Sequence, residues 1–339
     1  MLRLAWKRRW LQFSLRTLLL VVLVASLGLS WLAVSMQRAK RQADALAAVR
    51  QTGAAIWFAH ELKPSGGIAP GAEPPGPRWL RRLLGDDLFI RVHSIDFKDV
   101  SVDDAGLEPL GRIFSLERLF LRDAHVTDAG LVHLAPLTGL KGLELNSPFA
   151  ILIDDRKPRV IVEVRKPKDR GPPITDAGLE LLRNMKRLEV LRLRGTNVTD
   201  SVLKHLKGMP KLRTLDLGAT RVTDAALETI ADLTNLEELG LDFTQVTDAG
   251  LPHLAKLTKL RSLHLNGTQV TDAGMEHLGR LASLEFLSLF GTSVTDAGLR
   301  SLRELPQLKG LWPPRAATSD AGIKDLQRAL PNAKISPPM

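Results

Sequence analysis

A short sequence motif that contains an aspartate recurs along this chain every 24 residues or at a multiple of that spacing. In its fullest form the motif reads Val-Thr-Asp-Ala-Gly-Leu, as around Asp128 and Asp248. A Leu-x-x-Leu-x-Leu run precedes it, as at residues 212–217. A fixed period of about 20–50 residues indicates a stack of identical supersecondary units. The sequence therefore predicts a repeat array, an architecture that offers extended binding surfaces. The recurring aspartates are Asp104, Asp128, Asp176, Asp200, Asp224, Asp248, Asp272, Asp296 and Asp320.

Each repeat predicts a short strand followed by a helix. The leucines of Leu-x-Leu alternate with period two, so they face one side of a strand. After the strand, Thr or Asp can offer a side-chain oxygen to free backbone N–H groups, and we expect the aspartate to cap the following helix. Leucines three apart, such as Leu251, Leu254 and Leu257, form one apolar stripe on that helix. Neither element buries its apolar face alone, so stacking produces a continuous core.

The turn after the strand repeats two further positions. Gly195, Gly267 and Gly291 fit a tight turn, because glycine adopts backbone conformations that other residues avoid. A threonine follows at the next position, and we expect these threonines to form a hydrogen-bonded ladder that joins successive loops. The threonines are Thr196, Thr220, Thr244, Thr268 and Thr292.

The consensus Leu-x-Leu-x-Gly-Thr-x-Val-Thr-Asp-Ala-Gly-Leu resembles the leucine-rich-repeat family. More narrowly, it is similar to bacterial relatives of the ribonuclease-inhibitor-like and F-box-associated repeats, and the resemblance covers residues 79–336. It implies an α/β leucine-rich-repeat solenoid with a curved parallel sheet inside and helices outside. It also implies binding by the concave face of that sheet, without identifying the partner. The segment 13–20 resembles the start of many bacterial membrane-anchored repeat proteins.

An apolar segment near the N-terminus predicts a transmembrane helix. Residues 17–36 are twenty residues without a charge, which at 1.5 Å per residue span a hydrocarbon core of ~30 Å. The alternative is a cleaved signal peptide, whose apolar stretch is usually about 7–15 residues long. Because this segment is longer and is followed by Arg38, Lys40 and Arg41, we favour an uncleaved single-pass anchor. The short basic tail, residues 1–16, is expected to stay in the cytoplasm, which places the repeats on the non-cytoplasmic side.

The net charge of +10 does not indicate a nucleic-acid partner. Residues 1–50 carry nine basic side chains and one acidic side chain, so +8 of the charge flanks the predicted anchor. The remaining residues carry 38 basic and 36 acidic groups, a balance of only +2. A nucleic-acid-binding protein should show its basic stripe on the folded domain. We therefore expect a membrane partner and no nucleic-acid partner.

Composition divides the rest of the chain. Residues 37–62 predict a helix leaving the membrane and a short strand. Residues 63–78 contain five prolines and four glycines and predict a linker. Residues 79–339 form the predicted repeat domain, with residues 79–91 covering the open end of the first repeat and Ile335 at a last strand position.

One insertion interrupts the period at about residues 147–171. Two alternating apolar runs, residues 149–153 and 160–164, flank a charged stretch and predict a hairpin. The hairpin is either a tolerated loop or, since loops on a rigid scaffold often carry contacts, a second binding element.

The sequence contains no pattern typical of an enzyme. It lacks a Gly-Lys-Ser/Thr phosphate loop, a Gly-x-Ser-x-Gly elbow and a His-Glu-x-x-His motif. It also has no cysteine, which excludes disulfides and cysteine catalysis. Four histidines recur five residues after their aspartates, but packed helices lie about 8–10 Å apart, whereas zinc needs ligands within ~2.1 Å. We therefore expect no catalytic residues, no metal site and no cofactor. The four histidines are His133, His205, His253 and His277.

The expected binding surface is the concave face, where side chains from strands about 4.7–4.9 Å apart form a dense array. Along the chain this array is first basic, then acidic, then aromatic. Aromatic side chains often dominate interfaces, so we expect Phe286, Phe290 and Trp312 to bind a protein or peptide. The charged zones should mainly affect association rate and salt dependence. The candidates are Arg118, Phe120, Arg122, Glu144, Asn146, Arg192, Arg194, Asp216, Glu238, Asp242, His264, Asn266, Phe286, Phe290 and Trp312.

Three functions fit these observations. The first is a membrane-anchored, non-catalytic module that binds a protein or peptide. The second is a structural component of the cell envelope whose repeats only pack against neighbours or cell-wall polymer. The third is a substrate adaptor, because similar repeats accompany F-box domains; residues 37–90 do not resemble an F-box, so this function ranks last.

Overall fold

The computed structural model describes the chain in two compact units. The anchor unit comprises residues 15–47 and 60–90, and the repeat unit comprises residues 48–59 and the described residues from 91 onward. The described residues are 15–63, 68–69, 71–98, 100, 102–122, 125–145, 150–153, 160–163 and 174–335.

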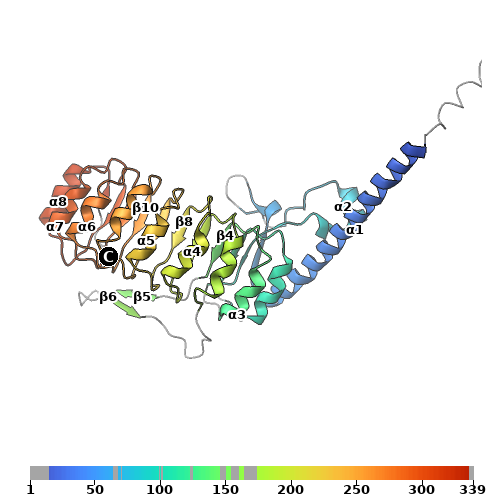
Figure 1. Ribbon diagram of the computed structural model, residues 1–339, viewed down its shortest axis with the longest axis horizontal. Coiled ribbons are helices and arrows are strands. Elements are labelled where there is room, and N and C mark those ends of the chain that lie inside the picture. Colours follow the sequence, from blue (N-terminus) through green and yellow to red (C-terminus); the bar gives the residue numbers. More distant parts are fainter. Residues whose placement is uncertain are drawn as a thin grey trace, which may run out of the picture. The chain divides into compact units, whose positions relative to one another are not determined.

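The repeat unit is built on an 11-stranded sheet in which the strands follow one another in chain order, with only the inserted hairpin left out. From β2 onward, neighbouring strands are parallel, and the middle leucine of each strand lies beside the equivalent residue of the next, as Leu239 beside Leu263. The predicted parallel sheet is thus confirmed (Figure 1). The strands are β1 Ala55–Phe58, β2 Val92–Asp96, β3 Arg118–Phe120, β4 Gly142–Glu144, β7 Val190–Arg192, β8 Thr214–Asp216, β9 Glu238–Gly240, β10 Ser262–His264, β11 Phe286–Ser288, β12 Gly310–Trp312 and β13 Lys334–Ile335.

Short helices cover one face of this sheet, and Figure 1 shows α3 to α8 along that side. Many of the connecting elements are 3₁₀ helices instead of the α-helices expected, because a 3₁₀ helix rises about 2.0 Å per residue and spans the unit with fewer residues. The inward leucines are fully buried, among them Leu241, Leu251 and Leu254. The helices are α3 Asp128–Leu131, α4 Leu203–Leu206, α5 Asp224–Ile230, α6 Asp272–Leu278, α7 Asp296–Leu299 and α8 Asp320–Ala329, with η3 Ala105–Arg112, η4 Val132–Leu134, η5 Gly178–Asn184, η6 Asp200–Val202, η7 Leu251–Lys256 and η8 Arg300–Leu302.

The recurring aspartates join neighbouring repeats. Asp248 accepts hydrogen bonds from the Thr271 N–H at 2.9 Å and the Thr271 hydroxyl at 2.6 Å, and Thr271 belongs to the next repeat. The helix cap is the threonine, whose hydroxyl accepts the N–H of Ala273 at 3.3 Å. The expectation that the aspartate caps its own helix is therefore wrong. The same pair of bonds runs from Asp104 to Thr127, Asp128 to Thr175, Asp176 to Thr199, Asp200 to Thr223, Asp224 to Thr247, Asp272 to Thr295 and Asp296 to Ser319.

The glycine of the repeated phrase leaves room for this aspartate. A Cβ atom at Gly274 would lie 2.4 Å from Oδ1 of Asp248, closer than side-chain atoms approach one another. At the equivalent position Ala226 takes its place without loss of the bonds from Asp200 to Thr223. The glycine is therefore the favoured residue here but not an obligatory one.

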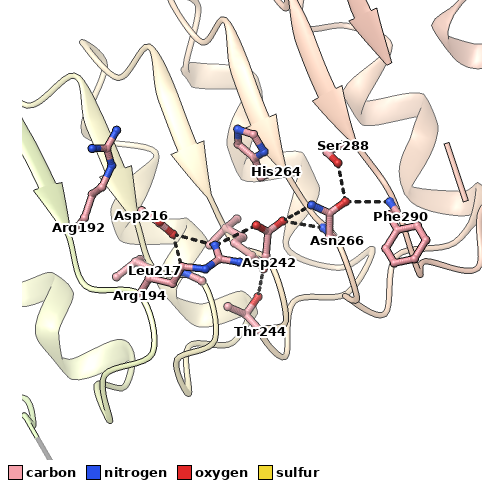
Figure 2. Close-up of polar contacts among 12 residues, drawn as sticks. Arg192, Arg194, Asp216, Leu217, Asp242, Thr244, His264, Asn266, Ser288 and Phe290 are labelled. Carbon is pink, nitrogen blue, oxygen red and sulfur yellow. Dashed lines mark hydrogen bonds and ion pairs between the residues drawn. The ribbon is translucent and has the colours of Figure 1, made fainter. Parts of the chain in front are cut away.

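The threonines of the strand turn hydrogen-bond within their own repeat. The Thr244 hydroxyl donates to the carbonyl of Leu241 at 2.7 Å, so the predicted threonine ladder between loops is wrong (Figure 2). The preceding turn position has positive φ, 63° at Gly267, which confirms the role of glycine there. Ala219 and Phe243 hold the same conformation with φ of 52° and 55°, in the left-handed region that L-residues disfavour.

The two ends of the sheet are formed by different kinds of strand. At the N-terminal end β1 pairs antiparallel with β2, so the strand from residues 55–58 occupies the edge. We expected residues 79–91 to cover the open end of the first repeat. Residues 60–90 instead group with the anchor unit. The domain limits given in the sequence analysis stay a prediction. At the other end Ile335 pairs with Leu311, as expected.

The insertion forms the predicted hairpin. Strands β5 (Ala150–Ile153) and β6 (Val160–Glu163) pair antiparallel, and β4 pairs directly with β7 across the insertion. The main sheet therefore continues without a break. The charged tip, residues 154–159, lies outside the described residues.

The anchor unit contains residues 15–47 of the long helix α1 (Leu15–Gln51), which joins the predicted transmembrane segment and the predicted helix after it. Its apolar part has a mean hydropathy of 2.4 and is not buried, so by length and composition this helix is able to cross a membrane. Further along, Gln42 donates from Nε2 to the carbonyl of Ile90 at 3.2 Å. The other helices are η1 Ala59–Glu61, which straddles the boundary between the units, α2 Arg78–Leu84 and η2 Asp86–Leu88.

Candidate binding surface

The candidate site is the sheet face opposite the helices, called the concave face below. Because the strands pair in register, its side chains stand in three columns that run across the repeats. Asn146 lies outside the described residues. The first column includes Arg118, Glu238 and Phe286, the second includes Phe120, Glu144, Arg192, Asp216, His264 and Trp312, and the third, two residues further on, includes Arg122, Arg194, Asp242, Asn266 and Phe290.

In the middle of the face the basic and acidic zones bind each other. The Arg194 guanidinium lies 2.9 Å from Oδ2 of Asp242 and 3.5 Å from Oδ1 of Asp216 (Figure 2). Asp242 is 6% exposed, so this carboxylate is almost wholly removed from water. The expected separate zones of free charge are therefore absent among these described residues, whose charges neutralise one another.

An amide extends this network to the late strands. Oδ1 of Asp242 accepts the Asn266 side-chain amide at 2.8 Å and the Asn266 N–H at 2.9 Å. Oδ1 of Asn266 in turn accepts the Ser288 hydroxyl at 2.5 Å and the Phe290 N–H at 2.9 Å (Figure 2). Successive repeats are thus connected by polar side chains, which hold this part of the face in one arrangement.

The early part of the face is organised around Glu144, which is 5% exposed. Arg122 lies 3.3 Å from its carboxylate and Arg192 lies 3.7 Å from it. The Arg122 guanidinium also lies over the Phe120 ring, 5.3 Å from the centroid. Arg118, by contrast, is exposed.

The remaining polar candidates contact hydroxyl groups of their neighbours. Glu238 accepts the hydroxyl of Thr214 at 3.3 Å, and Nε2 of His264 lies 3.1 Å from Oγ of Ser262. Both residues are half-buried. They therefore belong to the same connected surface as the charged groups.

The structure brings two of the three aromatic candidates together. Phe286 and Trp312, called the aromatic pair below, stack with ring centroids 6.4 Å apart and planes at 26°. Phe286 is 38% exposed although it is a large apolar side chain. Phe290 stands in the third column, half-buried and tied to the network by its backbone N–H. Of the three predicted aromatic residues, Phe286 and Trp312 thus form a stacked pair, and Phe290 is not part of that stack.

Glycines in the columns, which sequence reasoning missed, make these contacts possible. A Cβ atom at Gly218 would lie 2.3 Å from Nη1 of Arg194, and one at Gly310 would lie 2.8 Å from Cδ1 of Phe286. Each side chain therefore lies across the glycine of the next repeat. Glycine inside a strand often marks such a close approach, and Gly310 in β12 gives this signal, whereas Gly218 lies two residues after β8.

A row of charges precedes the first column and pairs along the edge of the sheet. Glu117 lies 2.8 Å from Lys141 and 3.1 Å from His93, and Glu285 lies 2.7 Å from Lys309. The Lys309 hydrogen bond lowers the pKa of the Glu285 carboxyl. Alternating signs make this row self-neutral, so it adds little long-range attraction for a charged ligand.

The described residues offer little for metal binding. Among them no group of three or more His, Asp or Glu side chains could hold a metal ion. Two hollows of about 260 and 290 Å³ lie off the concave face. Their linings include the ion pairs Arg303–Asp325 and Arg213–Glu237, so these four charged groups already have partners.

Comparison with known proteins supports the fold. Residues 256–279 match the family model described as Leucine Rich repeat. An internalin (inlF) from Listeria monocytogenes is 22% identical with a TM-score of 0.50, and the match covers 68% of this chain and 56% of that chain. An internalin C2 from the same organism is 24% identical with a TM-score of 0.46, covering 64% and 78% of the two chains. No curated protein matches significantly. This chain thus spans 56% of the length of the first internalin.

Proposed function

We propose that this chain, which has the repeats and the fold of leucine-rich-repeat proteins, binds a protein or peptide partner through the concave face. Helix α1 holds it in a membrane as a single-pass protein with the repeats on the non-cytoplasmic side. The role is binding without catalysis. Repeat arrays of this kind provide extended surfaces of many side chains, which suit a macromolecular partner better than a small substrate.

The aromatic pair is the observation that carries this proposal. An exposed Phe286 beside Trp312 leaves apolar surface in water, and covering it with a partner is favourable. Buried aromatic side chains of this type often contribute about 2 kcal/mol or more to an interface. A component that only packs in the cell envelope has no need of such a pair on its open face, so the aromatic pair favours partner binding.

The polar network supports binding in a different way from the one expected. Arg194 and Asp242 are already paired, so they offer a partner little free charge. Their contribution is to fix the surface before binding, which reduces the entropy lost when the complex forms. Arg118 is exposed at the start of the face and is the better candidate for a salt-dependent contact.

Photo-crosslinking at Phe286 tests the binding face. Benzoylphenylalanine replaces Phe286 in the full-length protein in its native membranes, and the same residue replaces Phe114, which is 54% exposed and lies off the strands of the sheet. We expect a crosslinked partner from position 286 only, and its loss when Trp312→Ala is added. Circular dichroism checks that each variant is folded. Equal crosslinking at both positions, or none at position 286, would remove the concave face as the binding site.

Extraction with alkaline carbonate tests the anchor separately. We expect the protein to stay with the membranes, because α1 exposes a continuous apolar surface. Sequencing the mature N-terminus distinguishes the two explanations of this helix. A soluble chain that begins near Gln37 would mean that the helix is a cleaved signal sequence.

A further inference from the structure

Helix α2 in the anchor unit turns two of its apolar side chains toward solvent, while Leu80 and Leu84 are half-buried. Trp79 is 67% exposed and Leu83 is 71% exposed, four residues apart on one face. Arg81, on the other side of the helix, is 9% exposed and binds Glu73 at 2.6 Å and Asp86 at 3.3 Å. In a helix surrounded by water this arrangement is inverted, because tryptophan and leucine gain from burial whereas arginine does not.

The exposed face of α2 also carries two basic side chains. Arg78 and Arg82 are exposed, four residues apart, and each directly precedes an exposed apolar residue; Arg78 also pairs with Glu73 at 2.7 Å, so Arg82 offers the freer charge. The face therefore presents an apolar stripe beside a basic stripe. A helix lying in the surface of a bilayer has this pattern, since apolar side chains enter the acyl boundary while arginines contact phosphate groups. Tryptophan in particular favours the boundary between apolar and aqueous regions.

The contact between Gln42 of α1 and Ile90 places part of the anchor unit close to the end of the apolar segment. One stripe of α1 is partly or wholly covered, at the spacing of three to four residues expected for a single helix face. The stripe begins at Leu32, inside the predicted membrane segment, and includes Gln42, which binds the Ile90 carbonyl. Gln42 lies six residues beyond position 36, a rise of ~9 Å, which is comparable to the thickness of the headgroup layer.

From these observations we propose that α2 lies in the surface of the same bilayer that holds α1, with Trp79 and Leu83 in the acyl boundary and Arg82 on phosphate headgroups. The occupant of this face is lipid, because α2 belongs to the same compact unit as the apolar part of α1 and the exposed Arg82 complements anionic headgroups. This inference rests on the proposed membrane anchor. The anchor unit would then have a fixed attachment in addition to the transmembrane helix.

Single-cysteine spin labels test the inference, and the absence of native cysteine makes such labelling clean. Leu83→Cys reports on α2, with Trp79→Cys as a second reporter on the same face. Trp31→Cys reports on the apolar part of α1, and Val132→Cys, 67% exposed in the repeat unit, provides the aqueous reference. The full-length protein is placed in vesicles of phosphatidylcholine and phosphatidylglycerol. Collision of each label with oxygen and with a water-soluble nickel complex is then measured.

We expect the ratio of oxygen to nickel collisions at positions 79 and 83 to exceed that at position 132 several-fold, with the highest ratio at position 31. A lipid signature at position 31 with aqueous values at 79 and 83 would overturn the inference and leave the anchor intact. An aqueous value at position 31 would show that the anchor itself fails. Labels at 79 and 83 shielded from both reagents, with disulfide crosslinking between Leu83→Cys chains, would mean that a second copy covers this face.

Discussion

Replacement of Asp248 by alanine tests whether the recurring aspartates join repeats. The carboxylate accepts two hydrogen bonds from Thr271 of the next repeat. A hydrogen bond to a charged group contributes about 1.5–3 kcal/mol, but solvent exposure of this pair reduces that value. We expect Asp248→Ala to lower the free energy of unfolding by about 1–3 kcal/mol. Leu241→Ala, which opens a cavity at a fully buried leucine, should cost about 2–5 kcal/mol.

Two further variants separate this contact from an effect on the local helix. Thr271→Val removes the hydroxyl partner, so a double-mutant cycle with Asp248→Ala should give a coupling of about 1 kcal/mol. Asp320 is the matched control: it also opens a helix after a capping Ser319, and no side chain of a following repeat donates to it among the described residues. Asp320→Ala should therefore cost less than about 0.5 kcal/mol.

Urea unfolding of the full-length protein in lipid nanodiscs, followed by far-UV circular dichroism, gives these free energies. Hydrogen exchange then locates the effect: Asp248→Ala should increase exchange around Thr271 to Met275, in the next repeat. Additivity of Asp248→Ala and Thr271→Val within about 0.3 kcal/mol would refute the contact between repeats. A cost at Asp320 equal to that at Asp248 would refute it too, because both would then act only on their own helices.

Three other changes follow from the contacts described. Ala219→Gly should raise the urea midpoint and increase the free energy of unfolding by about 0.5–1 kcal/mol, because glycine adopts the φ of 52° without the strain that alanine has there. A lower midpoint would contradict this strain. Hydrogen bonds from Ser319 lower the pKa of Asp296, so its stabilisation is present above the ordinary value of 3.8 and lost as pH falls through the lowered pKa. When the urea midpoint is measured at decreasing pH, it should therefore fall less steeply for Asp296→Asn than for the unchanged protein. An equal slope would count against this prediction. Arg194→Ala should destabilise the fold by about 1–3 kcal/mol, because Asp242 loses its cation, whereas Arg118→Ala should change the urea midpoint little; equal effects would disprove the network.

The periodic sequence predicts the strands well and the inter-repeat bonds poorly, for one physical reason. Leu239 and Leu263 are equivalent positions, so their alternation fixes both the strand and the parallel register. The same equivalence hides which threonine binds Asp248. Thr247, in the same repeat, and Thr271, in the next, occupy identical places in the pattern, and only the path of the backbone brings Thr271 to the carboxylate. Periodicity therefore identified the recurring threonine and aspartate, but the capping role expected for the aspartate was wrong, because its partner is Thr271 of the next repeat.

The sequence predicts which residues lie on the concave face, but it does not predict which neighbours their side chains contact. Arg194 and Asp242 stand two strands apart in the same column, which in a filled column would separate their charged groups. Gly218 lies between them without a side chain, so the guanidinium reaches across to the carboxylate. The sequence contained this information as a glycine two residues after β8, yet reading it required the register of three successive strands.

The same geometry explains why the aromatic pair differs from the rest of the face. Phe286 also lies across a glycine, Gly310, and meets the ring of Trp312. Arg194 lies across Gly218 and forms an ion pair with the carboxylate of Asp242, so both charged groups have a partner. Phe286 meets a second apolar ring and both remain accessible, with Phe286 38% exposed. Two equivalent gaps thus produce a closed polar network in the middle of the sheet and an uncovered apolar surface near its end, and only the second gains by contact with a partner.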